Sequence, residues 1–512
     1  MEMQTYQNPV ISGFNPDPSI CRVGEDFYLV TSSFEFFPGV PIYHSKNLVN
    51  WELINYCLTD EEQLRLKGCG PSDGIYAPTL RYWDGVWFMT VTNISDKGNF
   101  IVHTRDIRGK WSAPGWVDQK GIDPSLYFER SLRGHGEDGA PMYEDRAYFC
   151  SNGGEEGPGI YLCQVNPFTG ERLSASRKIS AGCGGKAPEA PHIYRIGEYY
   201  YLMMAEGGTE YGHGITMQRS RDIYGPYEAC PYNPVLTHRD AGGDPIQAVG
   251  HGDLTEDQNG NWWVVCLGIR PLEGSMLHNL GRETFLAPVV WQDSWPVIGN
   301  NGRIAGQMQG PLPGMALPAD RGFSDDFRNG LRLQWNTLRN HRAEDFQAEK
   351  GTLLIRGNEE DLDAFCGSPS FLGVRQPQFC VRAKTEVFVP RTDKTKAGMT
   401  AFYNGHFHYE IYVEKGEGGA YVNVRRRLFD LEMVTARAAV SEEGSLELKI
   451  EADEDYYSFF YRTGENWVLL DRGMTRGLTT EITDTRSFTG VFIGLFAVEG
   501  EAKFCGFSLE ER

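Results

Sequence analysis

The sequence lacks an excess of positive charge and lacks any long hydrophobic run. Its 512 residues include 49 lysines and arginines against 69 aspartates and glutamates, for a net charge of −20. Such a chain repels phosphates and anionic headgroups, so nucleic-acid and membrane partners are disfavoured. No apolar run approaches the ~18 residues of a membrane helix, and the first ten residues lack the basic start and apolar core of a signal peptide. These absences predict an unexported, cytoplasmic protein.

Cysteine pairs at metal-binding spacing are also missing. The 11 cysteines are odd in number, widely scattered and without a Cys-x-x-Cys pair, which predicts reduced thiols rather than a disulfide framework or a zinc site. The chain does have 60 glycines, 27 prolines and 12% aromatic residues. This composition favours short strands and tight turns over long helices, so we expect an all-β fold.

One design recurs five times in the N-terminal part: a turn of Gly, Asp or Asn, then bulky residues, then an apolar run. The second bulky residue is in turn Tyr28, Phe88, Tyr148, Tyr201 and Trp263, a spacing of about 60 residues. This period suits the blades of a propeller, each entered through a hairpin. Five unrelated hairpins in two sandwiches are the alternative, but these need not recur at a fixed interval. We therefore predict a five-bladed β-propeller over residues 1–314.

The repeat ends near residue 314, and segments of alternating apolar and polar residues follow. Examples are residues 407–413 and 446–450. Such alternation is typical of half-buried strands, so we predict a β-sandwich over residues 323–512. No low-complexity linker separates the two domains, and we expect them to be packed together.

Three carboxylates stand at matching places ahead of the blade hairpins. Asp17 and Asp123 each begin an Asp-Pro-Ser sequence. Glu189 stands at the equivalent position ahead of a third hairpin. The innermost strands of a propeller line one channel, so we expect the three to share a pocket. Clustered carboxylates raise at least one pKa, which lets a site hold an acid and a base together, as glycosidases require. Alternatively, Asp-Pro is only a turn dipeptide and Glu189 a surface charge.

These motifs resemble family 43 of the glycoside hydrolases, in the branch of β-xylosidases and α-L-arabinofuranosidases. They are NPDPS at 15–19, TSSFEFFPGVPIYHS at 31–45, GIDPS at 121–125, EAPHIY at 189–194 and LGRET at 280–284. The resemblance covers essentially the whole chain. It implies a five-bladed propeller followed by a concanavalin A-like β-sandwich. It also implies exo-acting, inverting release of terminal xylose or arabinofuranose from plant hemicellulose oligosaccharides.

The resemblance further implies residue roles. Asp17 would be the general base, Glu189 the general acid, and Asp123 the third carboxylate that tunes the acid, with Asp138 as a rival for that third place. No cofactor is required, although a calcium ion lies near the position of His251 in some relatives. The substrate-binding residues it implies are Phe34, Tyr76, Thr209, His251, Arg282 and Phe504, the last reaching from the sandwich to close the pocket.

Two departures from the family pattern affect substrate choice. Residues 75–79 read Ile-Tyr-Ala-Pro-Thr where relatives have Ile-Trp-Ala-Pro-His, and residues 188–192 read Pro-Glu-Ala-Pro-His where they have Thr-Glu-Gly-Pro-His. The sequence leaves open the choice between xylose and arabinofuranose and the oligomeric state, a homo-oligomer included. Two other functions remain as alternatives: a retaining fructan hydrolase of similar propeller fold, and a non-catalytic carbohydrate-binding propeller.

Overall fold

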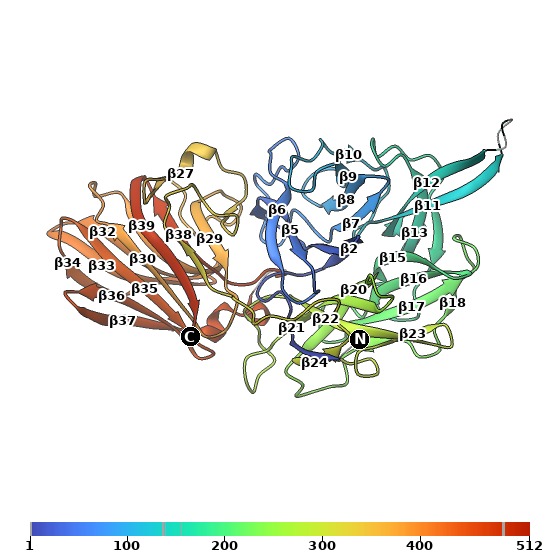
Figure 1. The fold of residues 1–512 in the computed structure, drawn as a ribbon. Helices are drawn as coiled ribbons and strands as arrows, with labels where there is room; N and C mark the ends of the chain where they lie inside the picture. Colours follow the sequence, from blue (N-terminus) through green and yellow to red (C-terminus); the bar gives the residue numbers. More distant parts are fainter. Residues whose placement is uncertain (1–2, 136–137, 139, 155, 484–486) are drawn as a thin grey trace.

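The computed structural model describes residues 3–512 apart from 136–137, 139, 155 and 484–486, and nearly all its regular structure is strand (Figure 1). The N-terminal part is a five-bladed β-propeller, and the C-terminal part consists of two packed sheets. The propeller prediction is confirmed, and the alternative of two sandwiches is wrong. Within the described residues the helices are the short 3₁₀ turns η1 (Ala343–Asp345), η2 (Thr475–Leu478) and η3 (Thr480–Ile482), and none could cross a membrane.

Each blade is an antiparallel sheet whose strands follow one another along the chain, so hairpins or short loops connect them. The first strands of neighbouring blades contact one another around the axis, and the five bulky markers all lie in second strands. Blades one and two comprise β2 (Ser19–Val23), β3 (Asp26–Val30), β5 (Gly39–Ser45) and β6 (Glu52–Leu58), then β7 (Thr79–Trp83), β8 (Val86–Asn93), β9 (Gly98–Thr104) and β10 (Gly115–Trp116).

The other three blades repeat this order. Blade three comprises β11 (Ser125–His135), β12 (Pro141–Gly154), β13 (Gly157–Val165) and β14 (Arg177–Ser180). Blade four comprises β15 (Glu189–Ile196), β16 (Tyr199–Glu206), β17 (Gly214–Ser220) and β18 (Glu228–Ala229), and β19 (Leu236–Thr237) also pairs with β17. Blade five comprises β20 (Gln247–Glu256), β21 (Trp262–Ile269), β22 (Glu283–Gln292) and β23 (Trp295–Ile298).

The ends of the propeller are joined by a short two-stranded sheet. Strand β1 (Gln4–Gln7) pairs with β24 (Gln307–Gly310). The Asn8 side chain fixes this pair to blade five, because it exchanges two hydrogen bonds with the backbone of Leu286, at 3.0 and 2.9 Å. The start of the chain thus closes the ring of blades.

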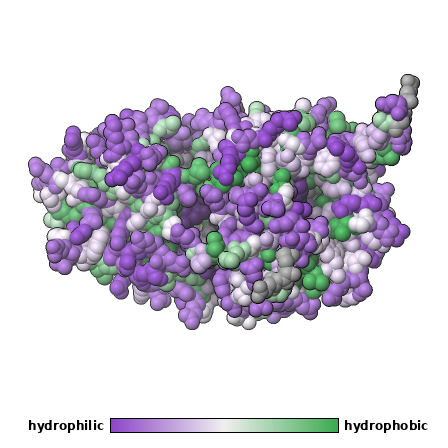
Figure 2. Space-filling model, viewed as in Figure 1, coloured by the Kyte–Doolittle hydropathy of each residue, from purple (hydrophilic) through white to green (hydrophobic). Residues whose placement is uncertain are grey.

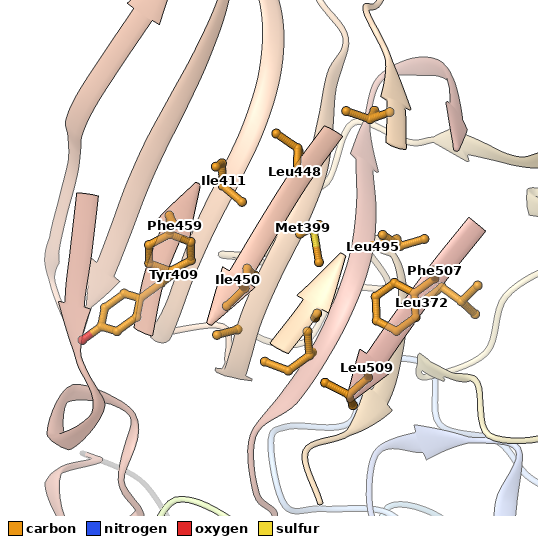
Figure 3. Packing of buried hydrophobic residues seen from close by; sticks show 14 of the residues in the cluster. Leu372, Met399, Tyr409, Ile411, Leu448, Ile450, Phe459, Leu495, Phe507 and Leu509 are labelled. Carbon is orange, nitrogen blue, oxygen red and sulfur yellow. The ribbon is translucent and has the colours of Figure 1, made fainter. Parts of the chain in front are cut away.

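The C-terminal part is a sandwich whose core lies between two antiparallel sheets. In β30 (Val381–Phe388) every second residue is buried, the alternation expected of a strand with one face on a core. Large apolar side chains such as Met399, Ile411 and Leu448 fill the space between the sheets (Figure 3). One sheet holds β25 (Phe323–Asp325), β27 (Phe346–Glu349), β28 (Thr352–Gly357), β30, β35 (Ser445–Ala452), β36 (Tyr456–Thr463), β37 (Asn466–Met474) and β39 (Gly500–Glu511).

The other sheet crosses the domain boundary. It holds β26 (Asn336–Leu338), β29 (Ser370–Arg375), β31 (Lys396–Asn404), β32 (Phe407–Gly416), β33 (Gly419–Leu428), β34 (Leu431–Val440) and β38 (Phe492–Val498). Its edge is completed by β4 (Phe36–Phe37), which comes from a loop of blade one and pairs with β26. The sequence predicted that the domains pack together but did not predict this shared sheet.

Aromatic side chains from both domains bury the junction. The ring of Phe36 stacks on that of Phe492 with centroids 4.0 Å apart, and Phe14 lies 5.9 Å from Phe492. Both propeller residues are fully buried. By contrast, the face seen in Figure 2 is covered mostly by hydrophilic side chains. The contact between the domains is therefore an apolar interface rather than a tether.

Candidate active site

The three predicted carboxylates meet at the channel of the propeller. Asp17 lies just before β2, Asp123 just before β11, and Glu189 begins β15. Since these are first strands of their blades, all three side chains approach the axis from different directions. The charges of both Glu189 and Asp17 act on Asp123. Asp17 and Asp123 are buried, and Glu189 is half-buried.

The backbone at this site is locally strained. Asp17, Asp123 and His251 have φ values of 56°, 53° and 46°, and Ala190, which follows Glu189, has 50°. Left-handed values are uncommon for residues other than glycine, and they persist where the surrounding structure enforces them. The pairing of β15 with β16 also shifts register between Glu189 and His192. Such irregularities turn a side chain away from the regular sheet and toward the channel.

Asp17 is held as a carboxylate. The Arg282 guanidinium donates a 2.7 Å hydrogen bond to Oδ1, and the Ser32 hydroxyl donates a 2.6 Å hydrogen bond to Oδ2. Burial alone would raise the pKa of Asp17, but the charge of Arg282 and the hydrogen bond from Ser32 act against burial, and the pKa lies below its usual value. Asp17 is therefore ionised at neutral pH and can accept a proton.

Glu189 has the opposite character. Burial, followed by the negative charge of Asp17, raises the pKa of Glu189 to about 7. Burial and the charges of Glu189 and Asp17 also raise the pKa of Asp123 well above its usual value. Asp123 Oδ2 accepts a 3.2 Å hydrogen bond from the backbone N–H of Ala190, which fixes the chain next to Glu189. The site thus holds a proton donor beside a proton acceptor.

Aromatic rings and Arg282 form a wall beside Asp17. The rings of Phe34 and Tyr76 have centroids 5.3 Å apart, and Phe488 lies 5.7 Å from Phe34 and 5.9 Å from Tyr76. The Arg282 guanidinium lies over the faces of Phe34 and Phe488, and it donates a 3.1 Å hydrogen bond to the hydroxyl of Thr209. The structure therefore brings Phe34, Tyr76, Thr209 and Arg282 together, as expected.

Phe504 does not reach this wall, and its predicted place in the pocket is wrong. It lies in β39 between β28 and β30, paired with Leu353 and Val387, and is fully buried in the sandwich core. Phe488 of the sandwich contacts this wall instead, through the rings of Phe34 and Tyr76. The sequence contained a signal for this: residue 504 lies in an alternating strand, whereas residue 488 lies in an irregular segment before β38.

Asp138 is also excluded as the third carboxylate. Asp138 lies in an insertion between residues 131 and 142 that lengthens the β11–β12 hairpin, which projects from the propeller (Figure 1). Residues 136–137 and 139 of the insertion lie outside the described residues. Asp138 is exposed and accepts a 3.0 Å hydrogen bond from the backbone N–H of Ala140. Asp123 is left as the carboxylate beside Glu189.

His251 lies in the channel beside Asp17, and the calcium ion implied near it stays a prediction. Its Nδ1 lies 3.7 Å from Asp17 Oδ1. Burial lowers the pKa of His251, so the ring is neutral and this approach is not an ion pair. Calcium takes six to eight oxygen ligands. Across the described residues no cluster of three or more His, Cys, Asp or Glu side chains could hold a metal.

A second buried cluster joins the first strands of four blades. Asp253 of β20 accepts hydrogen bonds from Arg81 of β7, at 2.8 and 3.1 Å, from Ser19 of β2 and from Tyr194 of β15. Burial opposes the charge of Asp253, but Arg81 outweighs it and lowers the pKa of Asp253. The structure shows that its carboxylate crosslinks the inner strands.

Comparisons with known proteins agree with this geometry. The sequence matches the family described as "Glycosyl hydrolases family 43" over residues 6–296. It matches the family "Beta xylosidase C-terminal Concanavalin A-like domain" over residues 324–508. A non-reducing end α-L-arabinofuranosidase of Bacteroides ovatus is 40% identical over 507 residues, which are 97% of this chain and 92% of that protein. A β-xylosidase of Bacillus subtilis is 32% identical over 518 residues, 95% of each chain.

Solved structures give the same result. The structure titled xyloglucan PUL GH43B of Bacteroides ovatus has a TM-score of 0.91 at 38% identity, covering 99% of this chain and 100% of that chain. A xylan β-1,4-xylosidase of Bacillus halodurans has a TM-score of 0.90 at 31% identity, with the same coverage. The glycosidase hypothesis is thus confirmed over the fructan hydrolase and the non-catalytic propeller. This chain belongs to family 43 of the glycosyl hydrolases and carries the concanavalin-like C-terminal domain of the β-xylosidases.

Proposed function

We propose that this glycosidase releases terminal pentoses, xylose or arabinofuranose, from short plant hemicellulose oligosaccharides, with inversion at the anomeric carbon. The relatives named as an arabinofuranosidase and as β-xylosidases support a pentose. The observation that carries the mechanism is the opposite ionisation of Asp17 and Glu189 in one pocket.

In the proposed reaction, Asp17 takes a proton from a water molecule, and this water attacks the anomeric carbon. Glu189 gives its proton to the glycosidic oxygen as that bond breaks. The oxygens of Asp17 accept hydrogen bonds from Arg282 and Ser32, so its negative charge is already stabilised. Such a carboxylate is a weak nucleophile but can still accept a proton. This favours attack by water over a covalent sugar intermediate.

Asp123 acts on the acid rather than on the sugar in this proposal. Burial and the charges of Glu189 and Asp17 raise the pKa of Asp123 well above its usual value, and any negative charge that Asp123 carries opposes loss of the proton from Glu189. Its hydrogen bond to the Ala190 N–H holds the backbone beside Glu189. We infer that Asp123 keeps Glu189 oriented toward the glycosidic oxygen.

The sandwich supports an exo mode of action. A cavity of about 320 Å³ lies between loops of blades four and five and the sandwich, and Thr209, Tyr211, Arg282, Glu481 and Phe488 line it. This volume is near the lower end of the ~300–1,000 Å³ typical of small-molecule sites. Such a space suits one or two sugar units rather than a passing polymer. We propose that the enzyme acts on short oligosaccharides in the cytoplasm. Its 11 free cysteines suit that reducing compartment.

The test uses purified full-length protein and a panel of nitrophenyl glycosides. We expect turnover of β-xylosides, α-L-arabinofuranosides or both, and little of hexosides. Proton NMR of the first sugar released should show the inverted anomer before mutarotation, α-xylose from a β-xyloside. Initial release of the retained anomer would overturn the single-displacement mechanism, and turnover restricted to hexosides would overturn the substrate class.

A further inference from the structure

Glu35 is a fully buried carboxyl at the junction of the two domains, and the proposed mechanism does not use it. It lies between Phe34, which belongs to the aromatic wall, and Phe36, which pairs with the sandwich. Its exposed fraction is 1%. Carboxylates are rarely buried unless they are paired or hydrogen-bonded. The contacts of Glu35 therefore indicate what its charge holds in place.

Two hydrogen bonds connect Glu35 to Phe488 through one serine. Glu35 Oε2 accepts a 3.0 Å hydrogen bond from the backbone N–H of Ser72. The Ser72 hydroxyl in turn accepts a 2.8 Å hydrogen bond from the backbone N–H of Phe488. Ser72 has a φ of 59°, a conformation that a residue with a side chain keeps only when its surroundings enforce it. The carboxyl group thus helps to hold Ser72 in the conformation that binds Phe488.

The backbone of Glu35 is tied to the sandwich at the same time. Its carbonyl oxygen accepts a 2.8 Å hydrogen bond from the backbone N–H of Arg339. The buried Arg339 guanidinium donates to the carbonyl oxygens of Cys69, Phe365 and Gly367. Its positive charge acts on Glu35 through space. Glu35 is therefore the point where a propeller loop, the turn at Ser72 and the sandwich are joined.

We propose that Glu35 is a positioning residue for the sugar pocket: through Ser72, its carboxylate holds the sandwich segment that carries Phe488 against the propeller. The proposal rests on the proposed function, because it takes the rings of Phe34, Tyr76 and Phe488 as the wall that contacts the terminal sugar. Glu35 itself does not touch the sugar. It acts on substrate binding through Ser72 and Phe488.

Because Glu35 can be ionised or neutral, the strength of its hydrogen bond with the Ser72 N–H depends on pH. Burial raises the pKa of Glu35 to about 7, with Arg339 favouring ionisation and Asp73 opposing it. Cys69 and Tyr403 are the other titratable groups that face it. A carboxylate accepts the Ser72 N–H more strongly than a neutral acid does. As the pH falls through about 7, Glu35 takes up a proton, its hold on Ser72 weakens, and KM rises.

The kinetic test is Glu35→Gln, which keeps the shape and the acceptor oxygen but removes the charge. We expect a KM that is raised roughly three- to tenfold above pH 7 and no longer varies with pH, at an unchanged kcat. Ser72→Ala, which removes the hydroxyl that binds Phe488, should raise KM similarly. The double variant should add nothing further. A KM profile of Glu35→Gln that matches the wild type would overturn the proposal.

Asp73→Asn is the matched control in the same turn. The amide keeps an acceptor for the Gly70 N–H, which Asp73 Oδ2 now binds at 3.1 Å. It removes a charge that opposes ionisation of Glu35. We expect the pH at which KM rises to move downward, with KM above neutral pH unchanged. A KM transition that remains in Glu35→Gln would belong to another group and would overturn the proposal.

Hydrogen exchange gives a readout that needs no substrate. In full-length protein above pH 7, the Phe488 amide should exchange faster in Glu35→Gln and in Ser72→Ala than in the wild type. Unchanged protection of Phe488 in both variants would overturn the proposal. If no pentoside is turned over, the proposed function fails, yet the exchange measurement still decides the role of Glu35. If Glu35→Gln does not fold, Ser72→Ala alone decides it.

Discussion

In the proposed mechanism, the Glu189 side chain supplies the proton that the departing sugar needs. Replacing it by Gln should lower kcat on natural oligosaccharides by about 10²–10⁴-fold, because the amide cannot donate a proton in this way. A nitrophenyl glycoside should lose much less, since nitrophenolate leaves without a proton. Asp17→Asn is the comparison, because loss of the base should affect both substrates alike. If Glu189→Gln damages both substrates equally, Glu189 is not the acid.

The pH dependence of kcat follows from the same two residues. The reaction needs protonated Glu189 and ionised Asp17, so kcat should fall as the pH rises through about 7, the raised pKa of Glu189. On the acid side, kcat should fall only at pH values below the usual pKa of an aspartate, because the pKa of Asp17 is lowered. Arg282 lowers both pKa values, so Arg282→Met should move both limbs of the kcat profile to higher pH. Limbs that stay in place in this variant would contradict the charge assignment.

Between strands, the crosslink at Asp253 is expected to stabilise the ring of blades. Asp253→Asn removes the charge that pairs with the Arg81 guanidinium, whose side chain is 17% exposed. Loss of one partner of a buried ion pair typically lowers the free energy of unfolding by about 3–5 kcal/mol. Urea denaturation measures this change. Lys110→Met, which breaks the exposed pair with Asp60, should give no measurable change. Equal effects in both variants would contradict a structural role for Asp253.

The strands differ in how well the sequence predicts them. The five blades could be predicted because each repeats one hairpin, and the carboxylates could be placed because each lies just before or at the start of a first strand. The pairing of β4 with β26 could not, because two residues carry no periodicity and the partner lies some 300 positions away. Phe504 was misplaced for a related reason. An aromatic residue in an alternating strand fits a core or a pocket equally well until the place of its strand in the sheet is known. Phe504 faces the core.

For the whole molecule, the relation between the domains decides whether the propeller works alone. The rings of Phe14 and Phe36 pack on Phe492 of the sandwich, and Phe488 completes the pocket wall. The residues proposed for catalysis, Asp17 and Glu189, lie in the propeller, yet the wall beside them includes a residue from the other domain. The sandwich is thus part of the site, which a separate binding module would not be.

Truncation after residue 314 tests this dependence. The fragment would expose Phe14 and Phe36, which are fully buried in the whole chain, and an apolar patch of this kind promotes association. We therefore expect it to aggregate, or to be inactive where it stays soluble, by light scattering and a pentoside assay. Phe488→Ala in the full chain separates the two causes, because it keeps the interface and should raise KM alone. A soluble 1–314 fragment with full activity would contradict both roles, since neither the buried face nor the Phe488 ring would then be needed.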